Sequence, residues 1–367
     1  MSPPDVVRRV MSWANALPLI LVLLVAAHGL LALLGPGENL FVTTLFINMI
    51  LVLALQVFVG NTGVVSFGHG AFVAIGAYAS GILTMPLATK AAALPRLPEA
   101  LRGVELPLPA AIVVVVFVAI LIAIPVGVPI ARLSGAAASI ATFAFLVISN
   151  GILVGWADFT RGTQTFYGVP PLTTLDVALA AAMVAVVVAL AFRLSSFGLR
   201  LQASAEDELA AAASGIDVRQ LRLVAWVLSA AIAAVGGALL GHMLTSFAPG
   251  TFYLTQTLSL LTMLILGGSR TVTGAVTGTL VVTAVFEGLR RAENGLDLGS
   301  LHFSGAYGLQ QLGLGVFLLV AIWLRRDGLI GDRELILNRL WARRSMVRRA
   351  DRPRTNPLHD DEGGNNE

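Results

Sequence analysis

The amino-acid sequence predicts an all-α polytopic membrane protein with about ten transmembrane helices. Hydrophobic residues make up 56% of its 367 positions and charged residues only 12%, which is about half the charge of a typical soluble domain. The apolar residues gather in long runs, and roughly 20 such residues in a helix cross the hydrocarbon core of a bilayer. Arginine is concentrated at the ends of these runs and in the C-terminal tail.

The apolar runs divide the chain into a membrane domain and two flanking segments. In chain order, the predicted spans are residues 17–34, 41–59, 64–83, 109–130, 134–154, 174–192, 221–242, 252–266, 272–289 and 305–324. The first run is longer than the apolar core of a secretory signal, so we interpret it as a retained span. A transmembrane domain is therefore expected over residues 17–324, between an N-terminal segment at 1–16 and a tail at 325–367.

Arginine placement predicts that both termini are cytoplasmic, because cytoplasmic loops carry an excess of Lys and Arg. This orientation puts the polar stretch 193–220 inside and the loops 85–108 and 155–173 outside. The run 252–266 is short, and a re-entrant segment there would reverse everything that follows it.

The polar stretch contains a pattern typical of a short capped helix. Ser204 and Asp207 have the spacing of a capping box, and the alanines that follow favour a helix. Gly215 can end the helix in the left-handed conformation, and Asp217 can cap the next one. The expected first turn holds three carboxylates that favour the positive end of the helix dipole: Glu206, Asp207 and Glu208. A helix of about ten residues is roughly 15 Å long, so this stretch is either a docking element or an ordinary connector between spans.

A dense run of glycines, Gly60 to Gly70, overlaps the start of the third predicted span. Glycines let helices approach closely or let one break, and a broken helix offers backbone dipoles to a zwitterion within the membrane. The candidate contact residues are Gly63, Ser66, Gly68 and His69. The alternative is helix packing, with Ser66 and His69 hydrogen-bonding between helices. His69 is not expected to bind metal or act in catalysis, because no second His or carboxylate lies at ligand spacing.

A second glycine-rich element runs from Gly267 to Gly278 and can be a tight turn or a pore-lining segment. One such element in each half of the chain hints at a five-plus-five inverted repeat. A third pattern joins Ile140 to Phe145 with the outer loop from Thr160 to Pro170.

These patterns resemble the permeases of ATP-binding-cassette (ABC) importers, and more narrowly the LivM type of branched-chain amino acid permease. The acidic cluster followed by alanines and Gly-Ile-Asp resembles the cytoplasmic coupling loop of these permeases. Gly60 to Tyr78 resembles their glycine, serine and histidine signature, and the matches run in order over about residues 40–325. This chain departs from the family where it has Asn61, Ala205, Ala212 and Arg270.

The resemblance implies an ABC importer permease, with a coupling loop at 193–220 and a translocation path near Gly63, Ser66, Gly68 and His69. It implies a prokaryotic plasma (inner) membrane protein that imports branched-chain or similar apolar amino acids. The implied partners are ATP-binding subunits, a second homologous permease chain and an extracytoplasmic substrate-binding protein. Related permeases are also linked to urea and short amides, which leaves the substrate class open.

Several functions are disfavoured by residues that the chain lacks. No Walker A sequence is present, so any ATPase is a separate subunit. Cysteine is absent, and no Gly-x-Ser-x-Gly or His-Glu-x-x-His motif occurs, so no catalytic residue, metal or cofactor is expected. An ATP-independent secondary transporter remains an alternative, although such proteins often bury ionisable residues in their spans and here Glu287 is the main exception.

The tail is rich in arginine up to Arg354 and then in Asn, Asp and Gly. It is either a solvated positive-inside segment or a surface helix on anionic lipid or on the ATPase, and residues 355–367 are expected to be disordered. Because the basic charge lies at membrane edges and in this tail, it does not indicate a nucleic-acid partner.

Overall fold

The computed structural model describes residues 17–34, 39–293, 296–298 and 301–303, with a few isolated positions up to residue 331. The predicted tenth span and both flanking segments therefore lie outside the described residues, apart from isolated positions.

Apart from its loops and turns, the described chain is helical except for one short hairpin. The helices of its first half are α2 (Leu17–Leu34), α3 (Asn39–Leu55), the π-helix η2 (Gln56–Gly60), α4 (His69–Thr84), α5 (Leu87–Ala93), α6 (Glu99–Arg102), α7 (Leu108–Ile130), α8 (Gly135–Gly155) and α9 (Ala157–Thr160). The second half contains α10 (Leu175–Leu194), α11 (Ser196–Glu206), α12 (Glu208–Ala213), α13 (Val218–Leu244), the 3-10 helix η3 (Pro249–Phe252), α14 (Leu254–Gly267), α15 (Val272–Glu293) and the antiparallel pair β1 (Leu296–Leu298) and β2 (Leu301–Phe303).

Seven helical segments of the described chain are long and apolar enough to cross a membrane. They are Asn39–Gly60, Leu108–Ile130, Gly135–Gly155, Leu175–Leu194, Val218–Leu244, Pro249–Gly267 and Val272–Glu293. Each matches one predicted span within a few residues at its ends. These spans confirm an α-helical polytopic membrane protein, whereas the total of ten spans and the inverted repeat stay predictions.

Three predicted segments differ from the structure. The third predicted span is helical only from His69, because residues 63–67 have no regular secondary structure. The outer loop 85–108 contains α5 and α6, and the loop after α15 contains the β1–β2 hairpin.

The core is built around α13, which packs against α3, α4 and α7. Small residues bring the backbones of α4 and α13 into contact: a Cβ at Gly76 would lie 2.0 Å from the Ala234 carbonyl oxygen, and one at Gly237 would lie 2.0 Å from the Val73 carbonyl oxygen. Small residues at helix crossings are the usual means of close packing in membranes.

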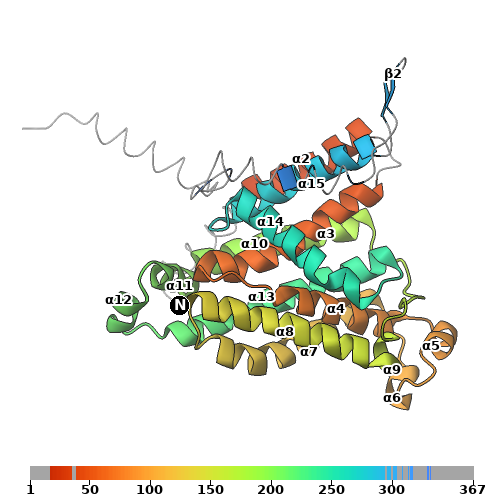
Figure 1. The fold of residues 1–367 in the computed structure, drawn as a ribbon, viewed down its shortest axis with the longest axis horizontal. Coiled ribbons are helices and arrows are strands. Elements are labelled where there is room, and N and C mark those ends of the chain that lie inside the picture. Colours follow the sequence, from red (N-terminus) through yellow and green to blue (C-terminus); the bar gives the residue numbers. More distant parts are fainter. Residues whose placement is uncertain are drawn as a thin grey trace, which may run out of the picture.

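The two ends of the bundle carry different connections (Figure 1). α11 and α12 lie at one end, and α5, α6 and α9 lie at the opposite end. This separation agrees with the predicted orientation, in which residues 193–220 and the loops 85–108 and 155–173 lie on opposite sides of the membrane.

Candidate functional site

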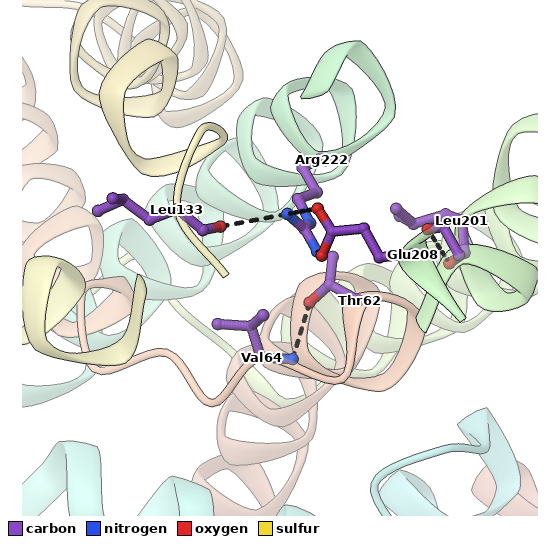
Figure 2. Close-up of polar contacts among 7 residues, drawn as sticks. Thr62, Val64, Leu133, Leu201, Glu208 and Arg222 are labelled. Carbon is purple, nitrogen blue, oxygen red and sulfur yellow. Dashed lines mark hydrogen bonds and ion pairs between the residues drawn. The ribbon is translucent and has the colours of Figure 1, made fainter. Parts of the chain in front are cut away.

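The glycine-rich segment interrupts the helical path between α3 and α4. α3 widens into the π-helix η2, and π-helices frequently mark functional sites. Gly63 then takes a positive φ of 71°, which a residue with a side chain rarely adopts. The Thr62 hydroxyl holds the chain where it leaves the helix, because it donates to the Phe58 carbonyl (2.8 Å). It also accepts from the Val64 N–H (3.1 Å), and Figure 2 shows this second bond.

Residues 63–66 alternate between the surface and the interior. Gly63 and Val65 are exposed, whereas Val64 and Ser66 are buried. Of the four residues predicted to lie on a translocation path, only Gly63 is at the surface of this chain. Ser66, Gly68 and His69 are buried inside it.

A hydrogen-bond network holds the His69 ring in one orientation. Nε2 lies 2.9 Å from the Ser229 hydroxyl, which itself donates to the Trp226 carbonyl (2.8 Å). The Ser229 oxygen therefore accepts from Nε2–H, and Nδ1 accepts from the Ser66 hydroxyl at 2.9 Å. A neutral imidazole satisfies every partner, since one ring nitrogen donates and the other accepts.

His69 thus bonds across helices from α4 to α13, which is the packing role weighed above for this residue. Within the described residues, no group of three or more His, Cys, Asp or Glu side chains could hold a metal ion.

We call residues 63–68, which separate η2 from α4, the broken segment. Trp226 of α13 covers the junction between the broken segment and α4. A Cβ at Gly68 would lie 2.8 Å from Cη2 of the indole, so this position has no room for a side chain. The indole also packs edge-on against three rings from two elements, namely Phe58 of η2 and His69 and Phe72 of α4. A second anchor comes from α8, where the Thr142 hydroxyl accepts from the Phe67 N–H (3.2 Å).

The polar stretch 193–220 folds as two helices with a break at Asp207, which corrects the predicted capping box. Ser204 lies inside α11 and its hydroxyl donates to the Leu201 carbonyl (2.7 Å). The residue that caps α12 is Asp207, whose side chain accepts from the Ala210 N–H (2.9 Å). Only Glu208 therefore lies in the first turn of α12, while Glu206 ends α11.

The end of α12 is as predicted. Gly215 has a positive φ of 78°, and the Ile216 N–H donates to the Ala211 carbonyl (3.1 Å), which is the pattern of a Schellman motif. Asp217 then caps α13 by accepting from the Gln220 N–H (3.1 Å).

The predicted acidic residues make two ion pairs. Glu206 accepts from Arg270 of the α14–α15 turn (2.8 Å), and both side chains are exposed. Glu208 accepts from Arg222 of α13 (2.8 Å), whose side chain is buried. α12 itself is largely exposed, and its Leu209 shows 84% of its surface.

The broken segment and the polar stretch meet at the same end of the molecule. A Cβ at Gly63 would lie 3.7 Å from the Ala205 Cβ of α11. The Arg193 guanidinium donates to the Asn61 side-chain oxygen (3.5 Å), and Gly60 packs against the Ser269 carbonyl of the α14–α15 turn. Two sequence motifs more than 130 positions apart are therefore in direct contact. The two parts of the third sequence pattern, Ile140–Phe145 and Thr160–Pro170, lie apart in the structure. Thr142 bonds to the broken segment, whereas Thr160 ends α9 at the opposite end of the bundle.

Comparison with known proteins gives a consistent result. The family described as "Branched-chain amino acid transport system / permease component" matches residues 39–320. The chain is 25% identical over 346 residues to the high-affinity branched-chain amino acid transport system permease protein LivM of Salmonella typhimurium, covering 85% of this chain and 74% of that protein. It is 39% identical over 88 residues to the probable branched-chain amino acid transport permease protein LivH of Methanocaldococcus jannaschii, covering 24% of this chain and 27% of that protein. No solved structure matches.

Proposed function

The chain belongs to the family of branched-chain amino acid transport permease components, and from this premise we propose that it is the membrane-spanning subunit of an ABC importer driven by a separate ATPase. Membership makes it a multi-pass inner-membrane protein of a prokaryote and the permease of an ABC-type transport system. ATP coupling, the substrate and the individual partners are the proposal.

The observation that carries the proposal is the contact between an exposed short helix and a broken transmembrane segment. α12 projects from one end of the bundle with its side chains exposed. Through Ala205 of α11 it is joined to Gly63, where the membrane segment loses its helical form. A displacement of α12 can then be transmitted through α11 and shift the backbone of the broken segment. In this proposal Glu206, Asp207, Glu208 and Gly215 shape the surface that receives the ATP-binding subunit.

The proposed translocation path runs beside the segment Gly60 to Gly70. Gly63 and Val65 face outward, so they would line a path formed between this chain and a second homologous permease. Ser66, Gly68 and His69 do not line this path, because they are buried. Their role would be to hold the broken segment in place from the protein interior. Irregular backbone within a membrane needs a protein or aqueous neighbour rather than lipid, which is consistent with a path on this face.

The proposed substrate is a branched-chain or similar apolar amino acid, delivered by an extracytoplasmic binding protein. The spans supply apolar walls, and the broken segment supplies backbone dipoles for a zwitterion. Urea or a short amide is the second candidate within the same family. An ATP-independent carrier is less well supported, because the ionisable Glu287 is paired with Arg290 and Arg291 (2.7 and 2.6 Å) at the end of α15.

Co-purification and reconstituted uptake test this proposal. The chain would be expressed with the candidate ATPase, second permease and binding protein, purified, and placed in liposomes loaded with ATP. We expect the ATPase to remain bound to the chain and radiolabelled leucine, isoleucine or valine to accumulate only with ATP. Uptake of urea or a short amide instead would show that the proposed substrate class is wrong. Uptake without an ATPase would show that the protein is a secondary transporter rather than an importer subunit.

A further inference from the structure

Arg222 is a buried cation near the beginning of α13. The residue is only 5% exposed, and a buried guanidinium is stable only when it is well paired. Its two terminal nitrogens form a fork on Glu208, with distances of 3.1 Å to Oε1 and 2.8 Å to Oε2. The first of these nitrogens also donates to the Leu133 carbonyl at 3.2 Å. Figure 2 shows the guanidinium between these two partners.

These bonds join three separate parts of the chain. Glu208 begins α12, Arg222 belongs to α13, and Leu133 lies in the turn between α7 and α8. The neighbouring pair, Arg270 with Glu206, has a similar shortest distance of 2.8 Å, but its side chains are 60% and 67% exposed. Exposed ion pairs contribute little. In the Arg222–Glu208 pair the Arg222 side chain is 6% exposed and the Glu208 side chain 46% exposed, and the planar fork of the guanidinium fixes the relative orientation of the two partners.

Arg222 also shares a helix face with the residues that hold the broken segment. Trp226 and Ser229 follow it at the i+4 and i+7 positions, which lie on one side of an α-helix. Trp226 covers Gly68 and Ser229 bonds to His69. One face of α13 therefore contacts α12 at its beginning and the broken segment about two turns further along.

We propose that Arg222 is a positioning residue that holds α12 on α13 and on the α7–α8 turn, so that a displacement of α12 moves this face of α13 and with it the segment 63–69. The inference rests on the proposed function, since it assumes that an ATPase displaces α12.

The first measurement needs no ATPase. Because the chain contains no cysteine, Leu209→Cys gives a single site for a nitroxide spin label on exposed α12. We expect Arg222→Met to increase the mobility of this label in the purified permease. Arg222→Lys should restore part of the order, because Lys keeps the charge but lacks the planar fork. Arg96→Met is the control, since Arg96 forms an exposed pair with Asp158 away from this site, and it should leave the spectrum unchanged.

The second measurement uses the complete importer in liposomes, with uptake and ATP hydrolysis followed together. We expect Arg222→Met to lower the uptake per ATP by roughly tenfold while hydrolysis continues. Glu208→Gln, which leaves Arg222 bonded to Leu133, should lower the ratio less and serves if Arg222→Met does not assemble. Unchanged label mobility, or uptake and hydrolysis that fall in equal proportion, would overturn the positioning role. Failure of the unaltered chain to bind any ATPase would instead overturn the proposed function and leave the mobility result standing.

Discussion

The two glycine-rich segments look alike in sequence and fold differently. In Gly60 to Gly70 the chain leaves the helix, has no regular secondary structure from Gly63 to Phe67 and returns into α4. In Gly267 to Gly278 the glycines join α14 and α15 across a tight turn, and a Cβ at Gly278 would lie 2.1 Å from the Met263 carbonyl oxygen. The second segment is thus a tightly packed turn between two helices, and a pore-lining role for it stays a prediction.

The difference comes from the polar residues between the glycines. In the first segment, Thr62, Ser66 and His69 form bonds that stabilise the broken segment and its junction with α4. In the second, the Thr271 hydroxyl accepts from the Gly274 N–H (3.0 Å) and starts the next helix directly. Glycine permits both outcomes, and the hydrogen-bonding side chains select one.

The largest effect expected from this contrast is on stability, at the second segment. Gly278→Leu would force α14 and α15 apart, because a backbone carbonyl occupies the space of the new side chain. We expect a loss of about 3 kcal/mol in the free energy of unfolding, measured as a lower unfolding temperature of the purified protein and less chain in the membrane. Normal stability of this variant would show that the two helices are not packed through glycine.

At the first segment, the expected loss is in transport. Gly68→Leu places a side chain against the Trp226 indole and the Thr142 carbonyl, so the junction between the segment 63–68 and α4 has to shift. We expect the protein to reach the membrane while amino-acid uptake falls by at least about tenfold. Unchanged uptake at equal protein level would mean that the broken segment is not part of the translocation path. The two glycine-rich segments would then differ in structure but not in their role in transport.

A reversible cross-link can test whether the first segment has to move. The Cβ positions of residues 63 and 205 are 3.7 Å apart, within the range of a disulfide. In the double variant Gly63→Cys and Ala205→Cys, oxidation should stop uptake and reduction should restore it, with either single variant as the control. Full uptake by the cross-linked protein would mean that α11 and the broken segment stay together during transport.

The smallest expected effect comes from the hydrogen bonds behind the broken segment. Ser66→Ala leaves Nδ1 of His69 buried without a donor, which costs about 1 to 3 kcal/mol. Uptake per folded protein should change little, because Ser66 is buried and does not face the proposed path. If uptake fell strongly while stability stayed the same, Ser66 would belong to the path itself.

The sequence predicted those parts of the structure that depend on local chemistry. The spans follow from apolar length, and Gly215 and Asp217 follow from the needs of helix ends. The Ser204 capping box was wrong because α11 begins earlier, at its cap Ser195, and continues through Ser204. Ser204 and Asp207 are both possible caps in the sequence. Only the length of α11, which includes Ser204, leaves Asp207 as the cap of α12.

The contacts that define the site depend on tertiary packing and could not be predicted. In the sequence, Arg222, Trp226 and Ser229 all lie within the predicted span 221–242, and no local pattern gives any of them a role. Their roles emerge when α13 is laid against α4 and α12. A role for Ser66 and His69 in transport stays a prediction. Because both side chains are buried, such a role would be to support the broken segment rather than to contact the substrate.

The backbone contact between α4 and α13 limits the motions available to this protein. Gly76 rests on Ala234 and Gly237 rests on Val73 without intervening side chains, so these helices cannot slide past each other without steric overlap. We expect them to turn as one rigid body. The flexible joint of this body would then be the chain from Gly63 to Phe67, which makes the break in the helix a hinge as well as a wall of the path.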